Sequence, residues 1–430
     1  MPPTTSNTAP TASAGHLLGL IRSGRATTRG ELQRVTGLSR STVSHRLDQL
    51  FAAGWVRESA DGAAPSGPGG GRPANRLEFD GTHAVVLAAD LGTRHARAAV
   101  LDLEGRLLAG RTGPLVVADG PARVLDVLGA WFADLLRETD RGGGPGAGRP
   151  VCGVGLSVPG PVDHPAGRVV QPPIMPGWDG HPVPDGLRRA LAAHAGDRLG
   201  GRGGAGAAEA GGGVPVLVDN DANLMAYAEQ RAAHPDCAAF LLVKVSTGIG
   251  AGMVVDGGIY RGTDGGAGDI GHVRLHDRPD ALCPCGSYGC LAAVAGGGAL
   301  ARALSAAGAP AVSGSDVREL LAAGHPEAVR LAQEAGRRVG EVLGTAVTLL
   351  NPGVLMLAGE LAGPPFLSGV REVLYQRAMP RTTAHLSVVT SSLGDAAGLL
   401  GAGALAVEHL YAPGRADARI ARLAGAAGSG

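Results

Sequence analysis

Three of the five cysteines in this 430-residue chain lie within eight positions, in the stretch CPCGSYGC at residues 283–290. Thiols this close together could form a metal site, a redox device or a disulfide. The chain has no apolar run long enough to span a membrane, and its N-terminus lacks the features of a secretory signal, so we expect a cytoplasmic protein. In a reducing compartment clustered cysteines seldom form structural disulfides, which favours metal ligation over free surface thiols.

Three short helices are expected near the N-terminus, after a tail over residues 1–14 that we interpret as disordered. A capping box stands at Thr28–Glu31, Gly37 ends the second helix, and Ser39 can cap the third. The second and third helices, separated by a glycine turn, predict a helix-turn-helix motif whose third helix can lie in a DNA major groove. The polar residues near the start of that third helix are Arg40, Ser41, Thr42, Ser44 and His45.

A β-hairpin wing is expected to follow, with strands near 55–58 and 75–79 and a Gly/Pro/Ser-rich tip over 61–71. Arg72 at the base of the tip could enter an adjacent minor groove. Residues 1–80 carry nine arginines against six acidic residues, a balance that suits a polyanionic partner. We therefore predict a winged helix-turn-helix DNA-binding domain over residues 15–80; the alternative is a solvated helical bundle with an exposed loop.

From residue 81 to the end of the chain, residue 430, the pattern is that of an α/β domain with two similar halves, each opening with a meander of strands. Two such halves predict two lobes around a ligand cleft, the first over about 81–235 plus the C-terminal helix and the second over 236–394. The expected strands lie at 84–90, 96–102, 106–112, 151–157, 215–219, 239–246 and 354–358. The expected helices lie at 121–138, 291–306, 326–350 and 395–411.

The order of short motifs along the chain resembles that of the ROK family of bacterial repressors and sugar kinases. After the helix-turn-helix come DLG (90–92), VPGPVD (158–163), NDAN (220–223), STGIGAG (246–252), GDIGH (268–272) and CPCGSYGC. Each motif alone is weak evidence, but their shared order covers essentially all of the chain beyond residue 14. The resemblance implies an actin-like, RNase H-like two-lobed fold, a sugar between the lobes, a zinc ion beside it, and a homo-oligomer, either a dimer or a tetramer.

The resemblance also assigns the cysteine cluster, because family members bind structural zinc with one histidine and three cysteines. The matching residues are His272, Cys283, Cys285 and Cys290. Three thiolates and one imidazole fill a tetrahedral shell and leave no open position for water activation, so such a zinc would be structural. We expect the two isolated cysteines, Cys152 and Cys237, to be packed thiols.

The resemblance further implies a sugar site and a nucleotide site. Asp221 would hold the sugar and, in a kinase, would take the proton of the attacked hydroxyl. An Asn-Asp pair after a strand is also a common turn, so this signal is weak by itself. The residues implied for the sugar are Gly160, Asn220, Asp221, Asp269 and His272. Those implied for a nucleotide are Asp90, Gly92, Thr247 and Gly248.

Three departures from the kinase pattern weaken the case for catalysis. Asp269 is one methylene shorter than the glutamate of the kinases, and Ala292 replaces a second sugar-binding glutamate. Losing one charge-assisted hydrogen bond can cost about 1.5–3 kcal/mol. Arg94 stands at the threonine position of the first phosphate loop, whereas the second loop, around Thr247-Gly248, is intact. Glycine in that second loop suits phosphate binding, or alternatively a tight hairpin.

We therefore expect a transcriptional regulator, a repressor, whose partners are a double-stranded DNA operator and a sugar or sugar-derivative effector. Sensing requires only different affinities for two conformations and no turnover. The alternative is an ATP-dependent sugar kinase that carries a DNA-binding head. A third hypothesis, a ligand-blind protein controlled by partner contacts, is favoured by the lost glutamate.

Overall fold

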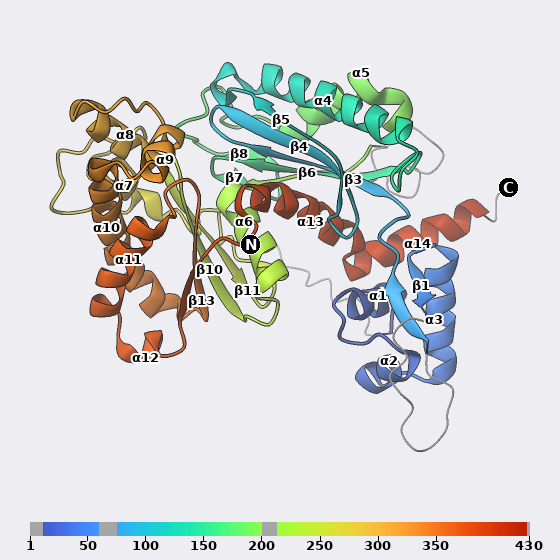
Figure 1. Ribbon diagram of the computed structural model, residues 1–430. Helices are drawn as coiled ribbons and strands as arrows, with labels where there is room; N and C mark the ends of the chain where they lie inside the picture. The colour runs from blue at the N-terminus through green and yellow to red at the C-terminus, as the bar shows by residue number, and fades with distance from the viewer. Residues whose placement is uncertain (1–11, 60–74, 200–212, 428–430) are drawn as a thin grey trace.

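The computed structural model of the protein describes residues 12–59, 75–199 and 213–427. It is an α/β structure in which a winged helix-turn-helix precedes a two-lobed, actin-like domain (Figure 1). Among the described residues, no helix has the length and apolar character needed to cross a bilayer.

The head has three helices and a hairpin, and local capping explains where each helix begins. The helices are α1 (Ala14–Arg22), α2 (Arg29–Thr36) and α3 (Arg40–Ala52), and β1 (Val56–Ser59) pairs antiparallel with β2 (Arg76–Phe79). Thr28 forms a capping box with Glu31, and Gly37 ends α2 in the left-handed region at φ 71°. Ser13 caps α1, which therefore starts just inside the tail expected over residues 1–14. Most of that tail, and the wing tip with Arg72, lie outside the described residues.

The first lobe contains a five-stranded sheet in the order β5-β4-β3-β6-β9. Its first three strands form an antiparallel meander, whereas β6 and β9 join in parallel. Helices α4 and α5 pack together on one face, and α13 covers β3 and β6 on the other. The bounds are β3 (Val85–Leu91), β4 (His95–Asp102), β5 (Leu107–Pro114), β6 (Val151–Val158), β9 (Val216–Asn220), α4 (Pro121–Arg141), α5 (Val183–Leu199) and α13 (Ala397–Tyr411).

The second lobe repeats this topology in the order β12-β11-β10-β13-β14. Its strands are β10 (Ala239–Val245), β11 (Ile249–Val255), β12 (Gly258–Ile259), β13 (Val354–Ala358) and β14 (Ser387–Thr390). The repeated order confirms the expectation of two similar halves. Between the lobes, α6 (Asp221–Ala233) packs on both α13 and β11. A small hairpin, β7 (Val162–Asp163) with β8 (Arg168–Val169), extends the first lobe.

Two of the expected helices differ in the structure. The segment 291–306 is divided into α7 (Leu291–Ala295) and α8 (Gly297–Ala306), because Gly296 adopts an extended conformation in close contact with the Ala292 carbonyl. The expected closing helix is not the last one, since Pro413 starts a further amphipathic helix, α14 (Pro413–Ala427). The remaining helices of the second lobe are α9 (Gly314–Ala322), α10 (Pro326–Leu350), α11 (Pro364–Arg377) and α12 (Pro380–Thr383).

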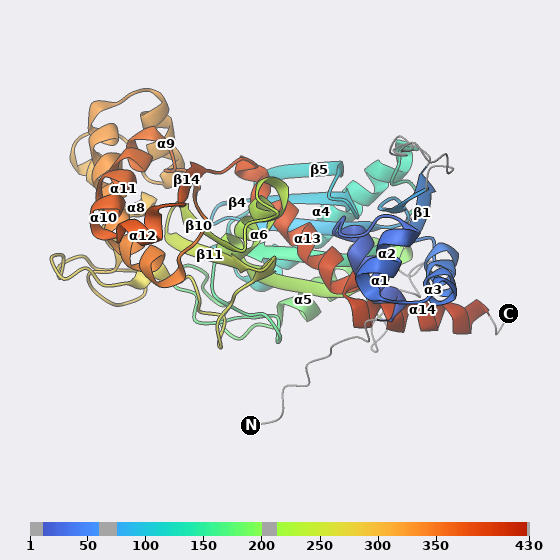
Figure 2. The same ribbon diagram turned by 90° about the horizontal axis from the view of Figure 1, so that it is seen from below.

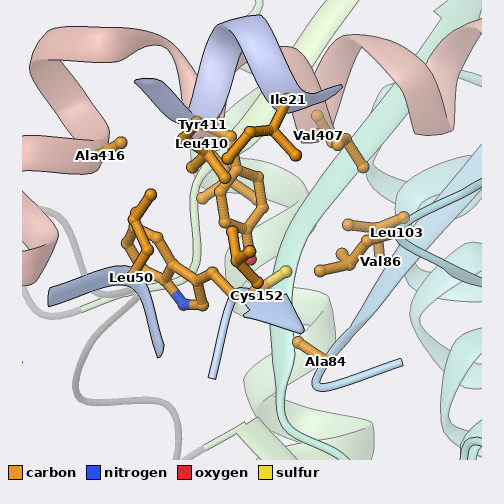
Figure 3. Packing of buried hydrophobic residues seen from close by; sticks show 14 of the residues in the cluster. Ile21, Leu50, Ala84, Val86, Leu103, Cys152, Val407, Leu410, Tyr411 and Ala416 are labelled. Carbon is orange, nitrogen blue, oxygen red and sulfur yellow. The ribbon is translucent and has the colours of Figure 1, made fainter. Parts of the chain in front are cut away.

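The head and the first lobe share one hydrophobic core. Tyr411, at the end of α13, is fully buried, packs edge-on against Trp55 of the head at 5.2 Å, and lies 2.6 Å from His83 Nε2 through its hydroxyl. Figure 3 shows Ile21 and Leu50 of the head gathered with Tyr411. Figure 2 shows α13 running from α6 towards α14, which lies beside α1. One helix therefore connects the interlobe region with the head.

The close packing of α13 on α6 gives a stability prediction. A Cβ at Gly401 of α13 would overlap the carbonyl oxygen of Leu224, so Gly401→Ala is expected to destabilise the protein by about 1–3 kcal/mol. Gly19, inside α1, is the matched control because a Cβ there meets no atom within 4 Å in the part of the chain that the structure describes. Gly19→Ala should stabilise by about 0.5–1 kcal/mol. Urea unfolding of both variants tests this; equal midpoints would contradict the packing described.

Candidate functional site

A cleft of about 800 Å³ lies between the lobes, where strands of both sheets end. Open α/β sheets bind ligands outside the carboxyl ends of their strands, so this is the expected place for a ligand. Every residue implied for sugar or nucleotide binding lines this one cleft. The set is Asp90, Gly92, Gly160, Asn220, Asp221, Thr247, Gly248, Asp269 and His272.

Asp90, near the end of β3, is held from two sides. The Ser157 hydroxyl on β6 donates to Asp90 Oδ1 over 2.5 Å, and Gly398 of α13 leaves room for the carboxyl group, since a Cβ there would lie 2.6 Å from Oδ1. Burial raises the pKa of Asp90, although the charge of Lys244 and the Ser157 hydrogen bond act in the opposite direction. The first turn of α13 therefore packs directly on the floor of the cleft.

Asn220 and Asp221 begin helix α6. Asn220 is the N-cap: its Oδ1 accepts from Ala222 N at 2.9 Å, while its Nδ2 donates to the Gly160 carbonyl at 3.1 Å. Asp221 is the first helical residue, where a carboxylate is favoured by the helix dipole. The sequence reading did not predict α6; the available signal was an N-cap asparagine before an Ala/Leu/Met/Glu-rich stretch.

Lys244, the only lysine in the chain, forms an ion pair with Asp221 across the cleft. Its Nζ lies 2.5 Å from Asp221 Oδ2, and Asp221 Oδ1 accepts from Ala222 N at 2.7 Å, so both carboxylate oxygens are engaged. Burial alone would lower the pKa of Lys244, but the charges of Asp221 and Asp90 raise it above its ordinary value. Sequence reasoning missed this residue; its signal is a single cation in the otherwise apolar stretch AFLLVKVS.

A second ion pair joins β4 to the segment just before α13. Arg97 on β4 donates to Asp395, just before α13, at 2.7 Å, and both residues line the cleft. Arg97 is one more residue that sequence reasoning did not identify. The cleft is thus lined by two ion pairs: Lys244–Asp221 joins the two lobes, and Arg97–Asp395 links β4 to the segment before α13.

The Thr247-Gly248 hairpin leaves space in the cleft. Gly248 does not adopt a left-handed conformation, and a Cβ there would meet no atom of the described residues within 4 Å. Neither backbone strain nor crowding therefore requires glycine at this position. The Thr247 carbonyl accepts from Gly298 N at 3.1 Å, which ties the hairpin to α8.

Asp269 and His272 are presented by the loop after β12. Gly268, at φ 100°, packs against the Ala251 backbone and starts the turn into the short 3₁₀ helix Ile270–His272. The Asp269 side chain is half exposed, and its Oδ1 lies 3.8 Å from His272 Nε2. A carboxylate is therefore available at this wall, whereas the nearby Ala292 offers only a methyl group.

The three clustered cysteines and His272 form a compact donor set. Their ligand atoms all lie within 4.8 Å of one another, and Cys285 Sγ–Cys290 Sγ and Cys283 Sγ–His272 Nδ1 are each 3.7 Å. Tetrahedral zinc with Zn–S bonds of about 2.3 Å separates two sulfurs by about 3.8 Å, so the donor set fits zinc. Cys152 is buried, and burial raises the pKa of its thiol to about 12; Cys237 also lies outside the set.

One thiol of the cluster ionises more readily than the others. Although burial acts in the opposite direction, hydrogen bonds from the Ser287 amide and from the Cys283 and Cys290 thiols lower the pKa of Cys285 to about 7. The pKa values of Cys283 and Cys290 are raised, chiefly by burial.

The polar face of α3 is exposed to solvent, whereas its apolar face is buried. Val43, Leu47 and Leu50 are fully buried in the shared core. Arg40, Ser41 and His45 are exposed, and Thr42 and Ser44 are half-buried. Arg46, on the same helix, is instead directed to the Ala12 carbonyl, which it reaches at 3.0 Å.

Comparisons with known proteins find relatives of two kinds. The model of the ROK family matches residues 206–409. A xylose repressor of Bacillus spizizenii is 25% identical over 384 residues, which covers 89% of this chain and 91% of the relative. The crystal structure of a ROK hexokinase from Thermus thermophilus is 31% identical with a TM-score of 0.56, covering 76% of this chain and 99% of that chain.

A third relative is similar to this chain over the head as well as over the two lobes. A ROK family transcriptional regulator, a homologue of the E. coli MLC protein, has a TM-score of 0.74 and 23% identity, and covers 95% of this chain and 98% of that chain. The hexokinase, by contrast, leaves part of this chain unmatched although it is itself covered almost completely. The xylose repressor and the transcriptional regulator are thus similar to this chain over nearly its whole length, whereas the hexokinase is similar to a shorter part of it. From the family match and the 31% identity with the hexokinase, the chain belongs to the ROK family.

Proposed function

We propose that this protein is a DNA-binding transcriptional repressor whose interlobe cleft binds a sugar or sugar derivative as its effector without phosphorylating it. The observation that carries the proposal is the winged helix-turn-helix, joined to the cleft domain through one continuous core. The match to a xylose repressor over 89% of this chain supports the same function.

Operator contact is assigned to the exposed start of α3. In helix-turn-helix proteins the N-terminal side chains of the recognition helix reach base edges in the major groove. Arg40, Ser41 and His45 are placed for this, with Thr42 and Ser44 closer to the protein. Because the opposite face of α3 is buried, these side chains are presented on a fixed helix. A two-fold dimer would match a palindromic operator, and we propose a dimer for that reason.

Departures from the kinase pattern argue against phosphoryl transfer. Asp221 accepts from Lys244 Nζ and from the Ala222 amide, and each carboxylate oxygen keeps a further lone pair that can accept from a substrate hydroxyl. The case for binding over turnover therefore rests on Ala292 in place of a sugar-binding glutamate and on Arg94 in the first phosphate loop.

Effector binding would act through the ion pairs that line the cleft. A sugar hydroxyl that bonds to Asp221 competes with Lys244, and a ligand in the cleft would also act on Arg97–Asp395, which adjoins α13. Since α13 ends in the head at Tyr411, a shift at its start can reach the DNA-binding helices. A ligand shifts such an equilibrium only by its different affinity for the two states.

Structural zinc is assigned to His272, Cys283, Cys285 and Cys290. When bound, the ion would crosslink the loop that carries Asp269 and His272 to the cysteine-rich turn. The protein side chains would then hold one wall of the cleft rigid, which limits the conformations that a ligand must select.

Transcription in vitro from the gene's own upstream region tests the function. We expect the purified protein to reduce transcript, and one member of a panel of pentoses, hexoses and N-acetylhexosamines to change that reduction. The same panel with ATP and magnesium in a coupled assay should give no turnover. Transcript unchanged by the protein, together with robust turnover, would establish the kinase alternative. Repression with no effect of any sugar would favour the ligand-blind hypothesis.

A further inference from the structure

A second cavity, of about 620 Å³, lies where the head meets the first lobe. Its walls come from α1 and β2 of the head, and from the β4–β5 turn, α6 and α13 of the two-lobed domain, which we call the body. Its size is within the range of small-molecule pockets. Both cavities touch α6 and α13, but no residue lines both of them, so this cavity is separate from the interlobe cleft.

One side of this cavity is apolar. Ile21 and Leu77 of the head and Val407 of α13 are almost fully buried and still contribute to the lining. Phe79 and Leu400 complete this side, and small residues of α6 and α13 keep the space open. Burying apolar surface against such a wall contributes about 25 cal/mol per Å², so a ring or short hydrocarbon is favoured here.

The lining also carries three arginines, of which Arg76 is exposed. The guanidinium groups of Arg22 and Arg231 each lie over an aromatic ring, that of Phe79 at 5.4 Å and that of Tyr227 at 5.2 Å, and have few ionic contacts. Arg22 is 11% exposed, and its ion pair is a long one, 3.4 Å to the half-exposed Glu408. Burial lowers the pKa of Arg22, and the nearby charge of Arg231 lowers it further, against the effect of Glu408. Among the described residues, Arg231 is hydrogen-bonded only to the neutral Tyr227 hydroxyl, at 3.2 Å, and makes no ion pair.

Two of the carboxylates that line the cavity are engaged elsewhere. Glu78 pairs with Arg57 of β1 at 3.4 Å. Asp102 accepts from the amides of Glu104 and Arg106, at 3.0 and 2.8 Å, within its own turn. Glu104 is exposed at the rim. The guanidinium groups of Arg22 and Arg231 therefore remain able to bind an oxyanion, which guanidinium holds with charge-assisted hydrogen bonds.

We propose that this cavity binds a small organic anion, a ring or short hydrocarbon that carries a carboxylate or phosphate, with Arg22 and Arg231 holding the oxyanion. Phe79, Leu400 and Val407 contact the apolar part. The occupant touches the head through α1 and β2 and the body through α6 and α13, so it bridges the two. This binding site does not depend on the function proposed for the interlobe cleft.

Calorimetric titration of the full-length protein with three naphthalene probes tests the site: 2-naphthoate, 2-naphthyl phosphate and the neutral 2-naphthol. At least one anion should bind about tenfold more tightly than the alcohol, and Arg231→Gln should remove most of that difference. Ala232→Trp, at an exposed position of the lining, should block all binding. Arg302→Gln, in the interlobe cleft, is the matched control and should bind like wild type.

Several outcomes would overturn the proposal. They are equal affinity for the acids and the alcohol, wild-type affinity in both Arg231→Gln and Ala232→Trp, loss of binding in Arg302→Gln, or no binding of either anion at millimolar concentration. Circular dichroism of each variant confirms that it is folded. Tighter binding by the carboxylate or by the phosphate supports the proposal in either case and identifies the preferred oxyanion.

Discussion

Replacing Cys290 with serine is expected to release zinc and to lower the midpoint of thermal unfolding by roughly 8 °C. Cys290 is 1% exposed and precedes α7, so its loss opens the proposed metal shell and leaves the turn without its crosslink. Loss of a structural metal is among the few changes that cost about 4 kcal/mol or more, and each kilocalorie shifts the midpoint by about 2 °C in a larger chain. Elemental analysis and differential scanning fluorimetry measure the two effects.

Cys237→Ser is the matched control for the zinc prediction. Cys237 is half-buried outside the cluster, and its thiol donates to the Ala239 carbonyl at 3.2 Å, a bond that serine can reproduce. This variant should keep its zinc and its midpoint. Chelation of wild-type protein should reproduce the Cys290→Ser midpoint. Wild-type protein that is purified without zinc and unfolds at the same temperature with or without chelator would contradict the assignment.

Arg40→Ala is expected to weaken operator binding by about 1–3 kcal/mol, or roughly five- to 150-fold, without loss of stability. Arg40 is exposed at the first position of α3, where a positive charge opposes the helix dipole, so its removal does not harm the helix. If the side chain contacts a base, the variant should also tolerate changes at one operator position. If it contacts phosphate, affinity should fall equally for all DNA sequences. The slope of log affinity against log salt concentration should then correspond to about one fewer released counterion.

Arg123→Ala, on α4 of the body, is the control for Arg40→Ala. Arg123 is 73% exposed and, among residues 12–59, 75–199 and 213–427, its one ion pair is with Asp119 at 3.4 Å. Its removal therefore changes the net charge equally but at a distance from the head. Fluorescence anisotropy with a labelled operator duplex measures both variants. Equal affinity of the two variants would show that α3 does not face the DNA.

Much of the fold follows from local signals in the sequence. Thr28 and Ser39 cap the helices that directly follow them, and Gly37 ends the helix that directly precedes it, so these helix limits could be located from capping residues and glycine alone. The strand meanders also follow from short apolar runs, such as those at 84–90 and 239–246. The missed features depend on contacts remote in sequence. A Cβ at Gly296 would lie 3.0 Å from the carbonyl oxygen of Thr247, and α14 is an arginine-rich helix that packs on α1.

The residues of the site also divide into those that local sequence indicates and those that depend on contacts remote in sequence. The motif glycines, Asn220, Asp221 and the cysteine cluster carry recognisable types and spacing, and the structure brings them together. The role of Lys244 could not be read locally, since its partner Asp221 is 23 residues earlier and in the other lobe. Arg97 and Asp395, 298 residues apart, form a contact that only the closed fold creates.

The most direct test of the central claim is the affinity of the full-length protein for a duplex from its own upstream region, measured by fluorescence anisotropy at about 150 mM salt. The DNA-binding function predicts saturable binding that is roughly 10³-fold or more tighter than for a scrambled duplex of the same length and composition. Equal affinity for the two duplexes would contradict sequence recognition by the head and, with it, the assignment of this protein as a repressor.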